Sequence, residues 1–255
     1  MIEDRVEREK AQYDEDIGLE KKREKFGNIL SHTHYFYEIQ KYNILKKVLD
    51  YANDKRALEI GSSAWCAWIE QQGIKPSKLD CINISEKELE RGIKLSKTSS
   101  LIKPSFHLMD AHKLDFKDET FDVVFGGAIL HHLDLPVALD EIYRVLKPDG
   151  LMLFTEPLDT NPIGKIVRVF TPYVRTIDEQ ALRFKEIAQI KKRFKINCHF
   201  EQLLTVPFGI LSRFIFKKPN NFMMRMVYII DRAISKILPP LGWFYRYFII
   251  VGQKK

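Results

Sequence analysis

The feature that most constrains this chain is an alternation of two kinds of segment between about residue 57 and residue 157. Short runs rich in β-branched and aromatic residues, which favour strands, are separated by longer amphipathic stretches, which favour helices. The runs read RALEI, KLDCINI, SFHLM, FDVVFG and GLMLFTE. Strands that alternate with helices form βαβ units, and such units build a parallel sheet. We therefore predict an α/β fold.

One helix and its end are marked clearly in this region. The stretch VALDEIYRVLKPDG places apolar residues at helical spacing and then reaches Lys-Pro-Asp-Gly, which ends a helix and leads into the next strand. Further along, we predict a helix over about residues 180–194, a strand over HFEQLLTV (199–206) and a last strand over YFIIVGQ (247–253). These two runs raise the expected number of strands to seven.

The segments divide the chain into four parts. Residues 1–54, highly charged and then aromatic, form an N-terminal helical cap that we expect over one edge of the sheet. Residues 55–157 form the core. Residues 158–241 hold a Pro-containing loop, the helix, the strand and an apolar-basic insertion, and residues 242–255 supply the last core strand. We thus expect one core sheet, with a cap before it and an insertion before its last strand.

Composition sets bounds on the setting and the partners of the protein. The three cysteines form no C-x-x-C pair, which predicts neither a disulfide framework nor a zinc site and favours a reducing, cytoplasmic setting. The charged N-terminus is unlike a secretory signal, and no apolar run approaches the roughly 20 residues that span a bilayer, so we expect neither export nor a transmembrane segment. A formal charge of +7 favours an anionic partner or, equally, a lysine-rich solvated surface.

The turn after the first predicted strand is the place where an open α/β sheet binds its ligand. This turn, Glu59-Ile60-Gly61-Ser62-Ser63, has only the first glycine of the dinucleotide pattern G-x-G-x-x-G and no Gly-Lys-Ser/Thr. NAD, FAD and nucleotide hydrolysis are therefore disfavoured. S-adenosylmethionine (SAM) fits better, since its carboxylate needs one close-approach glycine, Gly61, and a small neighbour, Ser63. Taken alone, such a turn is more often an ordinary connection between a strand and a helix.

Four stretches together carry a resemblance to a known family. They are ALEIGSSAW, CINISEKELERG, MDAHKLDF and FDVVFGGAILHHLDLPVALDEIYRVLKPDGLMLFTEP, of which the last is the most specific. From Arg56 to Pro157, and again in the last strand, the chain resembles the class I SAM-dependent methyltransferases, in particular the type 11, UbiE-like branch. The resemblance implies a Rossmann-like, mostly parallel sheet of seven strands and SAM as the cofactor.

The resemblance also implies a cofactor site. Asp110 takes the place of an acid that accepts from the adenine amino group, Ala111 that of a backbone N–H that caps the ring, and Asn83 that of an acid that binds the ribose hydroxyls. Asparagine lacks the charge of that acid, and Ser63 and Trp65 also depart from the family pattern. Tyr13 resembles part of an element that closes over the cofactor, although a solvated charged helix explains it equally well. The expected cofactor-binding residues are Tyr13, Glu59, Gly61, Ser62, Ser63, Asn83, Ile84, Asp110, Ala111 and Gly126.

Three residues are candidates for the chemistry itself. Methyl transfer from a sulfonium is an in-line displacement that depends on alignment in a dry pocket, and hydroxyl or amine acceptors can also need a base. His131, His132 and Glu156 follow the ends of predicted strands that open onto one crevice, and we expect them to act as general base and to orient the acceptor. Neighbours on a helix do not share a face, so we expect one histidine to pack inward and favour His132 as the functional one.

Other polar residues carry weaker expectations. His32 and His34 are expected at the surface or in packing, and we predict no metal site. Arg168 and Arg175 resemble a segment that binds a phosphorylated acceptor in some relatives, but an ion pair with a nearby carboxylate is the more ordinary expectation.

For the acceptor we expect an anionic small molecule, such as a sugar nucleotide or a surface-glycan precursor. A quinone or lipid-linked acceptor at the membrane surface is the alternative, because the insertion (about residues 207–242) mixes large apolar side chains with Arg and Lys, which suits an interfacial helix and peripheral membrane contact. A lid or a dimer contact explains the same composition. Nucleic acid is disfavoured, since no Asn/Asp-Pro-Pro-Tyr site and no OB or KH module is recognisable. A non-catalytic binder is a further alternative, against which Asp110, both histidines and Glu156 argue.

Overall fold

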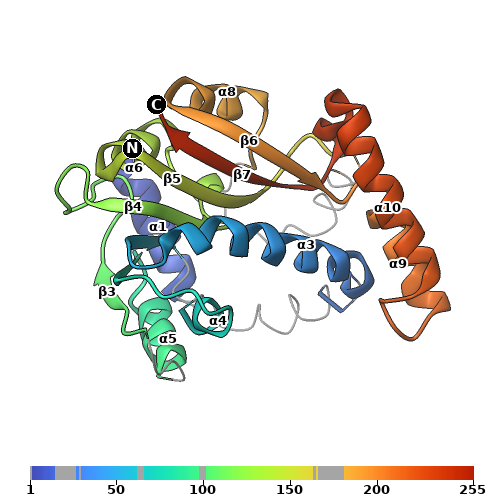
Figure 1. Cartoon of the computed structure of the whole chain (residues 1–255), viewed down its shortest axis with the longest axis horizontal. Helices are drawn as coiled ribbons and strands as arrows, with labels where there is room; N and C mark the ends of the chain where they lie inside the picture. Colours follow the sequence, from blue (N-terminus) through green and yellow to red (C-terminus); the bar gives the residue numbers. More distant parts are fainter. Residues whose placement is uncertain are drawn as a thin grey trace.

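The computed structural model describes residues 2–14, 27–28, 30–61, 66–97, 102–162, 165 and 181–255. At its centre is one sheet of seven strands in the order β3-β2-β1-β4-β5-β7-β6 (Figure 1). Strand β7 runs antiparallel to both of its neighbours, and the pairs among β1 to β5 are parallel. The predicted mostly parallel α/β sheet is therefore confirmed. The strands are β1 (Arg56–Ile60), β2 (Lys78–Asn83), β3 (Ser105–Leu108), β4 (Phe121–Gly127), β5 (Leu146–Pro157), β6 (Phe194–Glu201) and β7 (Tyr247–Lys254).

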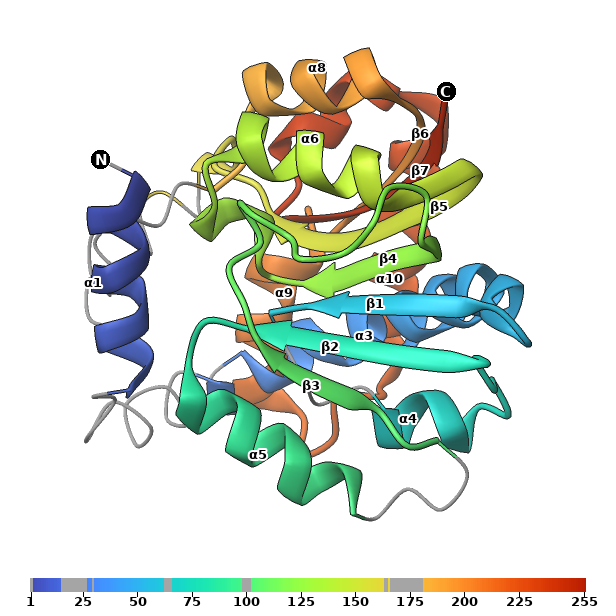
Figure 2. The ribbon, with the colours of Figure 1, turned by 90° about the vertical axis from the view of Figure 1, so that its left-hand side faces the viewer.

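Helices cover both faces of the sheet. Figure 2 shows α6 and α8 on one side of the sheet and α3 on the other. Within the part of the chain that the structure describes, no helix is long and apolar enough to cross a membrane. The α-helices are α1 (Ile2–Asp14), α3 (Ser31–Leu49), α4 (Cys66–Gln71), α5 (Glu86–Ser96), α6 (Leu135–Val145), α8 (Phe184–Arg193), α9 (Thr205–Ile215) and α10 (Phe222–Ile237), and the 3-10 turns are η1 (Asp50–Ala52), η2 (Leu130–His132) and η4 (Pro239–Phe244).

The central strands carry apolar residues on both faces because each face of the sheet has its own hydrophobic core. Leu58 of β1 and Val124 of β4 belong to the core beneath α6 and α8, whereas their neighbours Ala57 and Val123 belong to the core beneath α3. Successive side chains of a strand point to opposite faces, so a strand between two helical layers needs apolar residues on both sides. This arrangement explains why consecutive residues of these strands are apolar.

Local side-chain bonds set the ends of the core helices. The Ser85 hydroxyl accepts from the backbone N–H of Glu88 at 3.2 Å and begins α5, and the Asp134 carboxylate plays the same part for α6. Helix α6 ends at Val145, where the sequence predicted a stop. The Lys-Pro-Asp-Gly segment then forms an irregularity at the start of β5, with Asp149 at a φ of 61°.

The N-terminal segment differs from the expected cap over one edge of the sheet. Helix α3 lies on a face of the sheet, where Leu45 and Leu49 pack with Val123 and Phe125 of β4. Helix α1 stands separately, beside the ends toward which the parallel strands point (Figure 2). Helix α3 therefore packs in the core and α1 does not, because only α3 carries enough apolar residues.

The sequence placed one strand too late. Strand β6 covers residues 194–201 rather than 199–206, and Thr205 already begins α9. Strand β6 pairs with β7 over its full length, from Phe194 opposite Lys254 to Glu201 opposite Tyr247. The backbone N–H groups of residues 203–205 bind the carboxylate of Asp231, on α10, at 2.8 to 3.1 Å. A partner so far along the chain leaves no local signal, and therefore the helix start was not foreseen.

Helices α9 and α10 form a hairpin at the right-hand end of the view in Figure 1. The hairpin joins the rest of the molecule through α3, where Gly209 approaches the backbone so closely that a Cβ would lie 2.8 Å from Cα of Thr33. Asp231 secures its base, since the carboxylate is buried and holds the first N–H groups of α9. Burial raises the pKa of Asp231, although the N–H donors oppose the rise.

We expect Asp231→Ala to lower the free energy of unfolding by about 3 kcal/mol, because one buried and two partly buried N–H groups lose their acceptor together. Chemical denaturation at neutral pH measures this loss. The matched control is Asp140→Ala, which removes an exposed carboxylate paired with Arg193 at 2.6 Å and should change stability by less than about 1 kcal/mol. Equal losses in the two variants would show that Asp231 does not hold the base of the hairpin.

Candidate active site

A pocket opens where β1, β2 and β4 end, at the edge toward which the parallel strands point. It holds about 830 Å³ with its open mouth included. Segments from these strand ends form its wall, and α1 lies across it. The lining residues are Arg5, Val6, Glu9, Tyr13, Ile60, Gly61, Ile82, Asn83, Ile84, Glu88, Met109, Asp110, Ala111, His112, Gly127, Ala128, Ile129, His132 and Leu133.

Gly61 begins the loop after β1 in a conformation that favours glycine. Its φ is +85°, and a Cβ at this position would lie 2.5 Å from the side chain of Ile129. The glycine therefore lets the backbone at the end of β1 pass close to Ile129 beside the pocket. Ser62, Ser63 and Trp65, which the sequence analysis also singled out, lie outside the described residues.

Two expected cofactor-binding residues do not line the pocket. Glu59 is fully buried within β1 and accepts from the thiol of Cys81 on β2 at 3.5 Å. A Cβ on Gly126 would lie 2.7 Å from the carbonyl oxygen of Ile60, so this glycine permits the close packing of β4 against β1. The structure thus gives both residues a part in the sheet beneath the site.

Asn83 joins two loops of the pocket wall. Its side-chain Nδ2 donates to the carbonyl of Gly61 at 2.7 Å, and its Oδ1 accepts from the backbone N–H of Ser85 at 3.0 Å. A carboxylate has no hydrogen to donate to that carbonyl, which explains why an amide fits here. Ile84, the next residue, also lines the pocket, as the sequence analysis expected of a binding residue.

Asp110 is held in place by a histidine that the sequence analysis did not identify. Its Oδ1 accepts from the backbone N–H of His112 at 2.9 Å and lies 2.6 Å from Nδ1 of the same residue. Nε2 of that ring accepts from the backbone N–H of Asp134 at 2.8 Å, which connects Asp110 to the start of α6. Burial by itself would raise the pKa of Asp110, but the bonds from His112 lower it below its ordinary value. The pocket therefore contains an ionised carboxylate at neutral pH.

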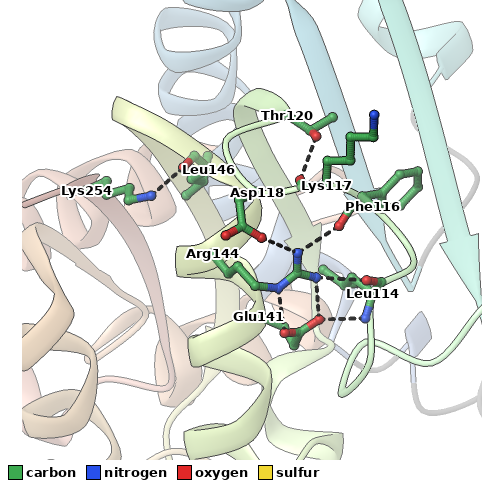
Figure 3. A network of polar contacts seen from close by, with 9 residues as sticks. All are labelled: Leu114, Phe116, Lys117, Asp118, Thr120, Glu141, Arg144, Leu146 and Lys254. Carbon is green, nitrogen blue, oxygen red and sulfur yellow. Dashed lines mark hydrogen bonds and ion pairs between the residues drawn. The ribbon is translucent and has the colours of Figure 1, made fainter.

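A second network ties the segment that follows Asp110 to α6 (Figure 3). The guanidinium of Arg144 donates to both carboxylate oxygens of Glu141 at 2.8 Å and to the carbonyls of Leu114 and Phe116 at 2.8 and 2.7 Å. Glu141 in turn accepts from the backbone N–H of Leu114 at 2.7 Å. Bidentate pairs of this kind fix geometry as well as charge. They anchor the loop on which Asp110 and Ala111 face the pocket.

The two adjacent histidines point in different directions. Nδ1 of His131 lies 2.6 Å from Oε2 of Glu156, and both side chains are buried away from the pocket lining. The other carboxylate oxygen accepts from the backbone N–H groups of Ile129 and Leu130 at 3.0 and 2.9 Å. Glu156 and His131 therefore hold the turn after β4, whereas His132 lines the pocket.

Helix α1 closes over the pocket through contacts with His132. Nδ1 of His132 lies 3.1 Å from the carboxylate of Glu9, and Nε2 lies 3.3 Å from the hydroxyl of Tyr13. At the end of the helix, Asp14 accepts from the Ser85 hydroxyl at 2.6 Å. The sequence had suggested a lid position for Tyr13. The charged spacing of α1 gave no sign that Glu9 would meet the histidine.

A separate group of aromatic and basic residues lies near the ends of β5 and β7. The rings of Tyr37 and Tyr247 stack with centroids 4.8 Å apart, and Nε2 of His34 lies 3.4 Å from the guanidinium of Arg246. Tyr247 pairs with Pro157, which follows Glu156 in β5, so this group stands at the same edge of the sheet as the pocket. We name these four side chains the β7 cluster.

His32 has a packing contact, with Nδ1 at 2.9 Å from the Ser212 hydroxyl on α9. Arg168 and Arg175 lie outside the described residues. Over the residues that the structure does describe, no three His, Cys, Asp or Glu side chains come together as a metal-binding group.

Comparisons with known proteins agree on the class of fold and domain. A methyltransferase domain family matches residues 58–154. The chain is 28% identical over 123 residues to the glycine/sarcosine/dimethylglycine N-methyltransferase of Actinopolyspora halophila, covering 46% of this chain and 21% of that protein. It is 29% identical over 141 residues to the demethylmenaquinone methyltransferase of Staphylococcus aureus, covering 54% of this chain and 56% of that protein. The alignments thus span from about a fifth to somewhat more than half of these relatives.

Solved structures share the fold over most of the chain. The YcgJ protein from Bacillus subtilis has a TM-score of 0.57 at 16% identity, covering 85% of this chain and 98% of that one. The N-methyltransferase NodS from Bradyrhizobium japonicum, in complex with S-adenosyl-L-homocysteine, has a TM-score of 0.55 at 15% identity, covering 86% and 88%. Residues 58–154 thus match a methyltransferase domain, and the solved structures share its fold.

Proposed function

We propose that this protein transfers a methyl group from SAM to a small-molecule acceptor. The observation that carries the proposal is the pocket itself: Gly61, Asn83, Asp110 and Ala111, from three different strand ends, line one cavity that α1 covers. Ligands of open α/β sheets bind at this edge. The likeness to NodS, whose structure contains S-adenosyl-L-homocysteine, supports the choice of cofactor.

The residues present fit SAM at most of the expected positions. The ionised carboxylate of Asp110 suits the adenine amino group, the backbone of Ala111 suits the ring edge, and the turn at Gly61 suits the methionine carboxylate. Asn83 differs, since its amide already bonds Gly61 and Ser85, and it contributes to the ribose mainly by shaping the wall. When bound there, SAM supplies a methyl group on a positively charged sulfur.

The chain contributes a base and a cover. Nε2 of His132 lies 3.3 Å from the Tyr13 hydroxyl, and it would accept a proton from the acceptor either directly or through that hydroxyl. Helix α1 excludes water from the pocket, which favours an in-line displacement over side reactions. Glu156 and His131 act through position, because they hold the turn that carries His132.

We further propose that the acceptor is an anionic small molecule, with a sugar nucleotide or surface-glycan precursor as the first candidate. The β7 cluster supports this choice, since Arg246 and the nearby Lys41 place positive charge around His34 at the same edge as the pocket. This charge lowers the pKa of His34 further after burial has lowered it, to about 3 in all. The neutral ring and the guanidinium together offer bonds to an anionic group.

A quinone or lipid-linked acceptor is the second candidate, as in the UbiE-like branch. Two observations favour it. The relatives include the demethylmenaquinone methyltransferase of Staphylococcus aureus, and several phenylalanines of α9 and α10 are exposed. Either acceptor fits a cytoplasmic setting, and nothing in the pocket favours nucleic acid.

We expect Asp110→Ala to weaken the binding of SAM and of S-adenosylhomocysteine by about 10- to 100-fold, because one charge-assisted hydrogen bond is lost. Calorimetric titration measures this without any knowledge of the acceptor. Asp115→Ala, which removes an exposed carboxylate on the same segment, is the matched control and should bind normally. Unchanged affinity in a folded Asp110→Ala protein would remove the adenine assignment.

Substitution of His132 should separate catalysis from cofactor binding. We expect His132→Ala to lower kcat by about 10²- to 10⁴-fold, the usual contribution of a general base, while SAM affinity changes by less than about threefold. The release of S-adenosylhomocysteine with an active acceptor reports kcat. His199→Ala on β6, away from the pocket, serves as the control. Full activity of His132→Ala would contradict its role as a base. Alignment of the acceptor with the methyl group would then be the source of catalysis.

The pKa of His34 predicts a pH-dependent stability. The ring titrates near 6.5 in the unfolded chain but near 3 when folded, so below about pH 6.5 only the unfolded chain gains the proton and stability falls. For a fully buried ring, the free energy of unfolding would fall by about 2 kcal/mol between pH 7 and pH 5. We expect a fall of about 1 kcal/mol because the ring is partly exposed. Thermal unfolding should therefore show that His34→Gln loses less stability than the wild type between pH 7 and pH 5. Parallel curves for the two proteins would contradict the assignment.

A further inference from the structure

Exposed apolar side chains are concentrated in one part of the molecule. Among the residues that the structure describes, twelve of the nineteen exposed large hydrophobic side chains lie between residues 205 and 244, which comprise α9, α10 and η4. Phe214 is 81% exposed, Phe222 73% and Ile237 74%. We call the exposed side of these residues the hairpin surface. Concentrations of this kind mark contact sites on soluble domains rather than ordinary surface variation.

The apolar exposure follows the helical repeat of α10. Phe222, Met226 and Ile229 are exposed at spacings of four and three residues, whereas Met224 and Val227 are buried against the rest of the molecule. Residues spaced in this way share one face of a helix. Helix α10 is thus apolar on its inner face, which the fold covers, and apolar again on its outer face, which no described part of the chain covers.

The charges around the hairpin surface all have one sign. Arg213, Lys217, Lys218, Arg225 and Lys236 are exposed, whereas the one carboxylate between residues 205 and 244, Asp231, is buried at the base. Lys217 and Lys218 lie in the turn between the helices, and in the sequence they stand between Phe214 and Phe222. Large apolar side chains with basic residues among them suit the boundary between lipid headgroups and acyl chains.

The hairpin is a formed structure before it meets any partner. Asn221 accepts from the backbone N–H of Met224 at 3.0 Å to begin α10, and its Nδ2 donates to the Ser212 hydroxyl on α9 at 2.8 Å. The same hydroxyl lies 2.9 Å from the His32 ring of α3. The exposed phenylalanines are therefore held outward on a rigid support, and no ordering of the hairpin opposes binding.

Two other uses of the hairpin surface fit the structure less well. A lid over the pocket would contribute lining residues, yet no lining residue of the described pocket comes from residues 205–244. A symmetric contact with a second copy would place the basic residues of one hairpin close to the same residues of the other, which is unfavourable. An anionic surface meets both requirements at once, because it accepts apolar side chains and neutralises the lysines and arginines.

We propose that the hairpin surface docks on an anionic lipid bilayer. Phe214 and Phe222 insert at the boundary between the headgroups and the acyl chains. Lys217 and Lys218 lie against the lipid phosphates. Because α9 packs on the first turns of α3 beside His32 and Thr33, docking brings the β7 cluster near the bilayer. The proposal concerns a binding surface and holds whether or not the pocket carries out methyl transfer.

Flotation with vesicles tests the proposal on the full-length protein. One set of vesicles contains phosphatidylcholine alone and the other contains about 30 mol% phosphatidylglycerol in phosphatidylcholine. We expect the wild type to float with the anionic vesicles at least about tenfold more than with the neutral ones, and less so as salt rises. Phe214→Ser and Phe222→Ser should each reduce flotation by about tenfold. Phe184→Ser, which changes a 53% exposed phenylalanine on α8, is the matched control and should float like the wild type.

Light scattering on the same proteins reports their oligomeric state, and circular dichroism confirms that each variant is folded. A wild type that stays with the soluble fraction would overturn the proposal. So would equal binding to neutral and anionic vesicles, because the lysines would then have no part in it. A stable dimer that dissociates on Phe214→Ser and ignores the vesicles would show instead that a second copy covers the hairpin surface.

Discussion

The candidate site depends on the hydrogen bonds between the buried carboxylate of Glu156 and the turn after β4. Glu156 stands at the end of β5 and accepts from two backbone N–H groups and one histidine ring of this turn. A buried carboxylate is tolerated only when its oxygens are bonded, so the turn has one favourable arrangement. That arrangement points His131 inward and leaves His132 against the pocket. Glu156, which does not reach the pocket, therefore sets the position of the candidate base His132.

Other polar residues around the pocket also hold its loops together. The sequence suggested ligand binding for some of them, but in the structure they form hydrogen bonds between loops. Asn83 bridges the loops after β1 and β2, and His112 connects Asp110 to the start of α6. The pocket is therefore pre-formed, and binding need not order its wall. Helix α1 differs, since none of its described residues belongs to the two hydrophobic cores and it meets the pocket through contacts such as Glu9 with His132. A cover held in this way can separate without disturbing the hydrophobic core.

Much of the site could be foreseen because it lies at strand ends, which are visible in the sequence, and because the motifs at those ends resemble those of a known family. Gly61, Asn83, Ile84, Asp110 and Ala111 all line the pocket. Glu59 and Gly126 do not, because they lie one or two residues within their strands, where side chains face the core or a neighbouring strand. Arg5, Glu9 and His112 were missed, since nothing local in the sequence shows which residues of a charged helix or a loop will meet a distant histidine or carboxylate.

The sequence by itself determined the α/β class, the mostly parallel sheet and the positions of several pocket residues. The class follows from local patterns such as apolar runs and helix ends, and the pocket positions follow from motifs that resemble those of a known family. Only the tertiary structure decided that α1 covers the pocket while α3 joins the core, that β6 begins at Phe194, and that α9 starts where Asp231 binds its first N–H groups. It also decided which of two adjacent histidines faces the pocket. These outcomes depend on partners more than twenty residues away in the chain, and an interaction between distant residues leaves no periodic pattern in the sequence that either one occupies.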